Sequence, residues 1–156
     1  KKGRAHVLRL IREVLYFEPK GVATDIGGAL EYLNKVIKRK SVVFLLSDFL
    51  SGGFHRPLQI ANKKHDIVTI KITDPRETGF DDVGLIELED AETGEVILVD
   101  TASSTFRKQF AARAEQDGAG LKRSFQLINV DHINIRTDLS YVVPLITFFK
   151  MRERRH

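Results

Sequence analysis

A chain of 156 residues with 42% hydrophobic content is long enough to bury a proper core, and it predicts one domain. The absence of cysteine excludes disulfides, thiolate catalysis and cysteine-ligated zinc, and it fits a reducing, cytoplasmic location. No apolar run approaches the roughly 20 residues of a membrane helix, and the start, KKGRAHVLRL, lacks the apolar segment of a signal peptide.

The net charge of +4 is gathered at the two ends of the chain. The basic residues there are Lys1, Lys2, Arg4, Arg9 and Arg12 at one end, and Lys150, Arg152, Arg154 and Arg155 at the other. Such clusters suit phosphates or acidic lipid, and they also suit solvated helix faces. We favour the solvated faces, because the nearby aromatic residues occupy helix-core positions and do not alternate with the basic residues. No nucleic-acid partner is therefore expected.

Two helices are predicted first. Apolar residues at helical spacing lie between Val7 and Leu15, and Pro19 to Gly21 end that helix. The second helix has Thr24 as its expected N-cap and an apolar stripe formed by Ile26, Leu30, Leu33 and Ile37. The apolar run from Val42 to Leu46 then predicts a central strand over 41–47, covered on both faces.

Helices and strands are also predicted along the rest of the chain. The pattern predicts a helix over 57–64 and a strand over 67–73, then a hairpin of strands 85–89 and 96–100 around Glu92, Thr93 and Gly94. A long helix over 103–128, weakened at 117–120, precedes a short strand at 134–136 and a last helix with Pro144 in its first turn. Together these elements predict a three-layer α/β sandwich with a mostly parallel sheet and an inserted antiparallel hairpin.

Four residues are candidates for a functional site. Thr24 and Asp25 open a helix, and Ser47 and Asp48 end the strand that follows it. A crossover helix runs antiparallel to the strands, so both pairs are expected at the carboxyl edge of the sheet, where α/β proteins bind ligands. Hydroxyl and carboxylate oxygens are ligands that Mg²⁺ or Mn²⁺ prefers. A capping threonine and a turn aspartate give the same pattern, and this alternative stays open.

The sequence contains no known metal-binding, nucleotide-binding or nucleophile motif. The five histidines show no metal-ligand spacing and are expected to be surface or half-buried residues. No G-x-G-x-x-G or Walker A sequence supports nucleotide binding, and Ser47 lacks the context of a nucleophile elbow. The acidic residues Asp81, Asp82, Glu87, Glu89 and Asp90 are interpreted as solvated hairpin surface.

The segment TDIGGALEYLNKVIKRKSVVFLLSDFL resembles domain-of-unknown-function family 58, whose core is similar to a von Willebrand factor A domain. The stretches KGRAHVLRLIREVL, KKHDIVTIKITDPRE, DAETGEVILVDT and FFKMRERR agree in the same order. The resemblance implies a Rossmann-like sheet with a metal-ion-dependent adhesion site at its carboxyl edge, in which Thr24 and Asp48 match family positions.

One part of the family pattern is missing. The Asp-x-Ser-x-Ser of the first strand does not occur, so residues 1–156 are expected to form a single truncated von Willebrand factor A-like domain from the carboxyl-terminal part of a longer parent. Thr24 and Asp48 alone offer too few oxygens for a tight cation site. We expect no firmly bound metal in residues 1–156, and we expect Mg²⁺ or Mn²⁺ binding only in the intact parent protein.

The resemblance implies a non-enzymatic protein-interaction module that works with a MoxR-type AAA+ ATPase, with Thr24, Asp25, Ser47 and Asp48 in the partner contact. The alternative is an enzyme, either a metal-dependent hydrolase or a phospho-acceptor domain that uses Asp48. Without the first strand, strand 41–47 is expected at the sheet edge, and the fragment is expected to self-associate through it. Alternatively, the amino-terminal helix covers that edge. Phe44 is expected to be a buried aromatic residue of a central strand. Its replacement by alanine is therefore expected to lower the stability of the fold by roughly 3–5 kcal/mol.

Overall fold

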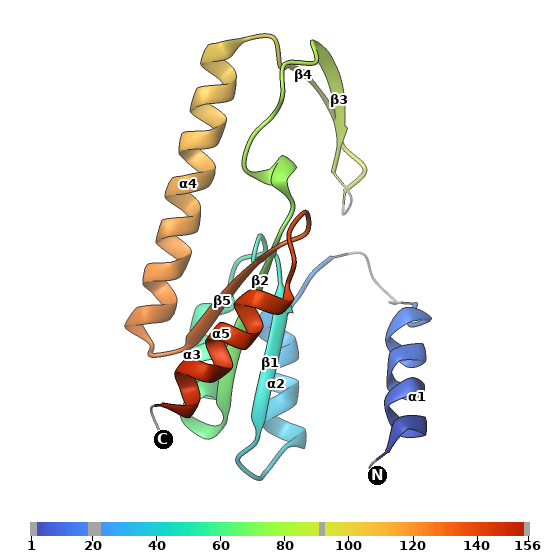
Figure 1. Ribbon diagram of the computed structural model, residues 1–156, viewed down its shortest axis with the longest axis vertical. Helices are drawn as coiled ribbons and strands as arrows, with labels where there is room; N and C mark the ends of the chain where they lie inside the picture. Colours follow the sequence, from blue (N-terminus) through green and yellow to red (C-terminus); the bar gives the residue numbers. More distant parts are fainter. Residues whose placement is uncertain (1–2, 19–22, 91–92, 155–156) are drawn as a thin grey trace.

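The computed structural model describes residues 3–18, 23–90 and 93–154 (Figure 1). Its elements in chain order are α1 (Arg4–Leu15), α2 (Ile26–Val36), β1 (Val42–Ser47), α3 (His55–Lys64), β2 (Asp66–Thr73), the 3₁₀ helix η1 (Pro75–Glu77), β3 (Leu85–Glu89), β4 (Val96–Asp100), α4 (Ser104–Leu127), β5 (Asp131–Arg136) and α5 (Val142–Glu153). None of the helices within the described ranges is long and apolar enough to cross a membrane.

The main sheet has three parallel strands in the order β1-β2-β5. The register pairs Val42 with Asp66 at one end of β1 and Ser47 with Lys71 at the other. On the far side of β2, Val68 pairs with Asp131 and Thr73 with Arg136. The parallel order confirms the prediction of a mostly parallel α/β sheet. Within the described part of the chain, β1 has a neighbour on one side alone, so it is an edge strand.

Helices cover both faces of this sheet, and each face has its own core. On one face α2, α3 and the end of α4 enclose a cluster of buried side chains: Ile26, Leu30, Phe49, Phe54, Leu58, Ala61, Ile67, Phe125 and Val130. On the other face α5 packs its Phe148 against Val68, Ile70 and Ile133. Odd-numbered and even-numbered residues of β2 therefore point into different cores, as the alternation of a strand requires.

The prediction that β1 is covered on both faces is wrong. Its burial alternates along the strand, and Val42, Phe44 and Leu46 are 57%, 46% and 60% exposed. Val43 and Leu45 pack against the α2–α3 core. On the opposite face α5 lies over β2 and β5, and it reaches β1 through Phe149, whose ring is 6.1 Å from that of Phe44. An apolar strip along the edge strand is left open to solvent.

Several predicted boundaries shift. The N-cap of α2 is Asp25, whose carboxylate accepts from the N–H of Gly28 at 2.8 Å, and not Thr24. Helix α3 begins at His55, so Pro57 is its third residue, where a missing N–H is still harmless. Strand β5 begins at Asp131, earlier than predicted.

The weak point predicted at 117–120 does not interrupt α4, which runs without a break from Ser104 to Leu127. Asp117 pairs with Arg113 one turn earlier at 2.9 Å, just before Gly118 and Gly120, and Leu121 and Phe125 pack into the core just after them. The hairpin β3–β4 and the place of Pro144 in the first turn of α5 are confirmed. Glu92, which was expected in the hairpin turn, lies outside the described residues.

Helix α1 forms as its periodicity predicts, yet none of its residues is buried. In Figure 1 it stands apart from the sheet and its covering helices. Its apolar side chains are open to solvent, with Val14 77% and Leu15 74% exposed. The apolar stripe that predicted this helix therefore has no partner surface among the described residues.

Candidate functional site

Strand β1 ends in a tight turn built by its own polar side chains. The Ser47 hydroxyl donates to Oδ1 of Asp48 at 3.3 Å and accepts from the N–H of Phe49 at 3.0 Å. Oδ1 of Asp48 also accepts from the N–H of Leu50 at 3.1 Å. This is the turn aspartate that the sequence allowed as an alternative. Both hydrogen bonds engage Oδ1, so the exposed carboxylate keeps Oδ2 for a partner.

The next residue, Phe49, is held in a strained conformation. Its φ of 58° lies in the left-handed region, which costs a non-glycine residue about 1–3 kcal/mol. Its side chain is 7% exposed and packs against Phe54 and Phe125, with ring centroids 5.4 Å and 5.2 Å away. Burial of the ring offsets the strain and fixes the turn that carries Asp48. The sequence pattern gave no signal for this conformation, because an aromatic residue is not expected there.

The beginning of α2 lies against the same turn. A methyl group placed on Gly27 would meet the carbonyl oxygen of Gly53 at 3.5 Å and Cγ of Pro57 at 3.6 Å. This contact places Asp25 and the neighbouring Thr24 at the edge of the sheet where β1 ends. We call residues 24–25 and 47–54 the β1 rim. Thr24 and Asp25 are exposed, and Oδ1 of Asp25 is engaged in the helix cap.

The rim does not fit a tight hard-cation site by itself. A tight Mg²⁺ or Mn²⁺ site needs about six ligands, mostly oxygens, in near-octahedral geometry. The rim offers two carboxylates, and one oxygen of each already caps backbone N–H groups. Across the described ranges no group of three or more histidine, aspartate or glutamate side chains is placed to hold a metal ion. The rim residues of this chain therefore do not form a complete metal site by themselves.

Lys71 is a rim neighbour that the sequence analysis missed. It pairs with Ser47 across β1 and β2, so its backbone lies at the same edge of the sheet. It lines a cavity of about 170 Å³ together with Leu50, Thr73, Glu77 and Arg113, among others. A signal existed, because after Asp66 at its start the strand β2 is apolar or threonine at every position except Lys71.

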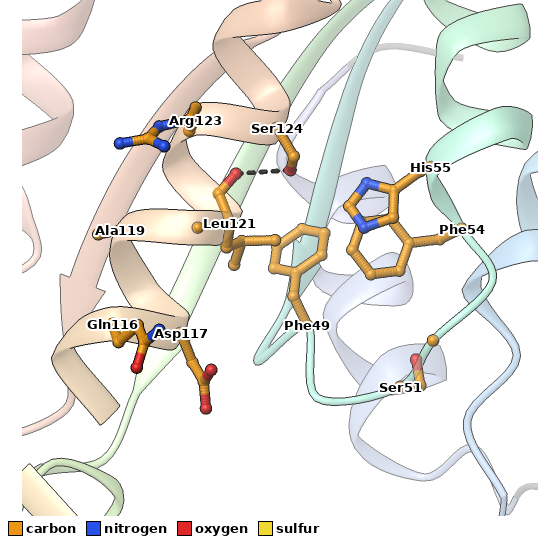
Figure 2. A pocket seen from close by; sticks show the side chains of 12 residues that line it. Phe49, Ser51, Phe54, His55, Gln116, Asp117, Ala119, Leu121, Arg123 and Ser124 are labelled. Atoms are coloured by element: carbon orange, nitrogen blue, oxygen red, sulfur yellow. Dashed lines mark hydrogen bonds between the residues drawn. The ribbon is translucent and has the colours of Figure 1, made fainter. Parts of the chain in front are cut away.

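A larger cavity of about 680 Å³ opens between the 49–55 turn and α4 (Figure 2). Phe49 and Phe54 form its aromatic wall, with the His55 ring 4.3 Å from that of Phe54. Within the described residues the buried hydroxyl oxygen of Ser51 has no hydrogen-bond partner. A cavity with an aromatic wall and an unsatisfied hydroxyl can receive an apolar side chain that carries a polar end.

One of the five histidines, His65, differs from the expectation of surface or half-buried positions. His65, the C-cap of α3, is 3% exposed. His132 is half-buried, and its Nδ1 lies 3.2 Å from the hydroxyl of Thr69. Burial lowers the pKa of His132 below its ordinary value of 6.5, and the charges of Lys71 and Lys122 lower it further. The surroundings of His132 therefore favour its neutral form.

These features define a class: an α/β domain with a parallel sheet whose edge strand ends on an exposed carboxylate beside two rim cavities. Residues 1–120 match the family described as "Protein of unknown function DUF58", and the chain belongs to this family. The match stops within α4, so β5 and α5 lie beyond the matched region.

Relatives are found in mycobacteria. Uncharacterized protein MAV169 of Mycobacterium avium is 31% identical over 137 residues, which cover 87% of this chain and 80% of that protein. Uncharacterized proteins Mb1516 of Mycobacterium bovis and Rv1480 of Mycobacterium tuberculosis are each 28% identical over 157 residues, covering 99% of this chain and 49% of theirs. The chain thus spans about half the length of these two longer relatives. No solved structure matches it.

Proposed function

We propose that this chain is a non-enzymatic protein-interaction domain and that the β1 rim is its contact surface. The observation that carries the proposal is the fixed, exposed carboxylate of Asp48 at the carboxyl end of a parallel strand. The strained Phe49 holds this carboxylate in place, and such strain is typical of functional sites. A lysine or arginine of a partner protein is a suitable ligand for the remaining oxygen.

The family resemblance supports a more specific form of this proposed function. We propose that the domain is von Willebrand factor A-like, lacks the first strand of that fold, and acts with a MoxR-type AAA+ ATPase. In a longer parent protein, Thr24 and Asp48 would contribute oxygens to a metal-assisted contact that other residues complete. The donor set of the rim supports a contribution of this kind and not a complete site.

An enzyme that uses Asp48 is the second candidate, and Lys71 is the observation that favours it. A lysine beside a strand-end aspartate can stabilise a phosphorylated carboxylate or a developing negative charge. However, Lys71 pairs with Ser47 and not with Asp48, and across the described residues no group of three or more histidine, aspartate or glutamate side chains is placed to hold a metal ion. A single carboxylate without a paired acid or base is a weak basis for hydrolysis.

The proposed function is tested by affinity capture with the purified longer parent protein, with and without Mg²⁺. The contact proposal predicts that Asp48→Ala loses a partner that the wild type retains, while circular dichroism shows an unchanged fold. Capture of the same partner by both proteins would overturn it. Phosphate release that stops in Asp48→Ala would instead support the enzyme, and salt-dependent retention on generic DNA would support a nucleic-acid role.

We also propose that the chain self-associates through the open edge of β1. The unpaired N–H and C=O groups of an apolar edge strand favour pairing with a second strand, and no charge lies between Val42 and Leu46 to oppose it. A two-fold dimer would join two sheets across β1. Light scattering over a range of concentrations tests this, with Leu46→Lys as the variant expected to remain monomeric. A wild-type chain that is monomeric throughout would contradict the dimer.

A further inference from the structure

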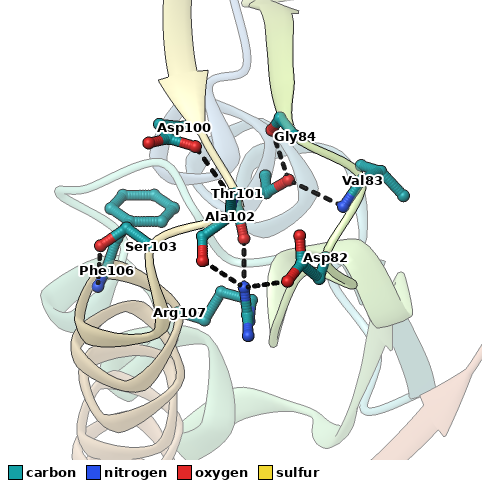
Figure 3. A network of polar contacts seen from close by, with 9 residues as sticks. All are labelled: Asp82, Val83, Gly84, Asp100, Thr101, Ala102, Ser103, Phe106 and Arg107. Carbon is teal, nitrogen blue, oxygen red and sulfur yellow. Dashed lines mark hydrogen bonds and ion pairs between the residues drawn. The ribbon is translucent and has the colours of Figure 1, made fainter.

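The hairpin β3–β4 is a separate two-stranded sheet that projects beside the amino-terminal end of α4 (Figure 1). Its base is fixed by a network around Thr101, whose hydroxyl donates to the Gly84 carbonyl at 2.6 Å (Figure 3). The Arg107 guanidinium donates to the carbonyl oxygens of Thr101 and Ala102 and lies 3.4 Å from the Asp82 carboxylate. The hairpin is therefore held at its base.

One face of the hairpin consists of exposed residues that combine apolar and acidic side chains. The cross-strand pairs on this face are Leu85 with Asp100, Glu87 with Leu98, and Glu89 with Val96. The apolar members Leu85, Leu98 and Val96 are 63%, 61% and 55% exposed. We call these six residues the hairpin face. A two-stranded sheet is marginally stable alone in water, so covering this face would stabilise it.

The charge of this region contrasts with the rest of the chain. Between residues 81 and 100 the sequence has eight acidic residues and no lysine or arginine, in a protein whose net charge is +4. On the hairpin face each of the residues Glu87, Glu89 and Asp100 lies opposite an apolar residue of the other strand. A complementary surface would combine apolar side chains with positive charges.

Helix α1 has this composition and packs on no surface among the described residues. It carries Arg4, Arg9 and Arg12 against a single acidic residue, Glu13, and none of its residues is buried. An isolated helix of this length is marginal in water, so α1 needs a surface to pack on. Twelve helical residues span about 18 Å and five strand residues about 17 Å, so the two surfaces match in length.

We propose that the hairpin face is a docking surface for a basic amphipathic helix, and that α1 of a second copy of this chain is the occupant. The apolar side chains of α1 pack on Leu85, Val96 and Leu98, and its arginines pair with the neighbouring carboxylates. This contact is heterologous and does not involve the β1 rim or the β1 edge. It is therefore independent of the proposed function.

A fluorescently labelled peptide of residues 3–16, titrated with dilute full-length chain, tests the proposal by anisotropy. Binding is expected, and it should weaken as salt rises because the pairs are exposed. The double variant Glu87→Lys and Glu89→Lys should bind the peptide at least about tenfold more weakly. The double variant Glu31→Lys and Glu115→Lys, two exposed changes outside the hairpin with the same total change of charge, is the matched control and should bind normally.

Leu98→Ser separates the apolar part of the contact from the charges, and it should also weaken binding. Absence of peptide binding, or equal binding by the double variant and the control, would overturn the proposal. Hydrogen exchange supplies a further check. A hairpin that is protected in a chain that stays monomeric at every concentration would mean that α1 docks within one molecule, and this would overturn the choice of a second copy.

Discussion

Replacing Phe44 by alanine distinguishes an open edge strand from a buried central one. A fully buried phenylalanine removes roughly 150–250 Å² from water. Phe44 is 46% exposed, so it removes only about half as much, roughly 100 Å². At about 25 cal/mol per Å² this burial is worth at most about 2.5 kcal/mol. The unfolded chain also buries part of the ring, and alanine keeps Cβ, so the expected loss is roughly 1–2 kcal/mol.

Phe125→Ala is the matched comparison on the other face of the sheet. Phe125 is 0% exposed and contacts the rings of Phe49 and Phe54, so its removal should cost roughly 3–5 kcal/mol. Urea unfolding followed by far-ultraviolet circular dichroism measures both losses, at concentrations where the chain is monomeric. A loss for Phe44→Ala equal to that for Phe125→Ala would refute the open face of β1 and would mean that another segment covers it in solution.

Three further changes test other contacts. Arg152→Met should destabilise the fold by about 2 kcal/mol in urea unfolding, because Arg152 lies 2.6 Å from Asp66 and 3.5 Å from Asp131, with its side chain 17% exposed; no loss would mean that α5 does not depend on these pairs. Because the pKa of His132 is lowered from 6.5 in the folded chain, the unfolded chain takes up the proton first as the pH falls. Wild-type stability should therefore drop below about pH 6.5 more than that of His132→Gln, and parallel pH profiles would contradict this. Arg107→Met should speed amide exchange in β3 and β4 and leave β2 unchanged, because methionine cannot donate to the carbonyl oxygens of Thr101 and Ala102. Unchanged exchange in the hairpin would argue against this role of Arg107.

The sequence predicts the order of elements well where local patterns dominate. The hairpin strands match their predicted bounds, because alternation and a glycine turn are local signals. Whether β1 is a buried central strand or an exposed edge strand could not be predicted from local patterns. Its apolar run is typical of a central strand, but its exposure depends on which strands and helices lie beside it, and that is decided by contacts far along the chain.

The candidate site was predicted in part for a similar reason. The position of Asp48 at the carboxyl edge follows from strand and helix order, and the turn around it agrees with the alternative that the sequence left open. Lys71 and the positive φ of Phe49 were missed, because register across strands and burial of one ring in a distant cluster are tertiary properties. The weakness predicted at 117–120 does not interrupt α4, and Leu121 and Phe125, which follow the glycines, pack into the core.

The most direct test of the proposed contact at the β1 rim is the affinity of a purified MoxR-type AAA+ ATPase for this domain, measured by calorimetry. Asp48→Asn keeps the size and the turn-capping oxygen of the side chain and removes its charge, and Asp81→Asn is the control on an exposed residue elsewhere. The account predicts that Asp48→Asn raises Kd at least about tenfold, while Asp81→Asn leaves it unchanged. Equal Kd values for wild type and Asp48→Asn would contradict the claim that this carboxylate binds the partner.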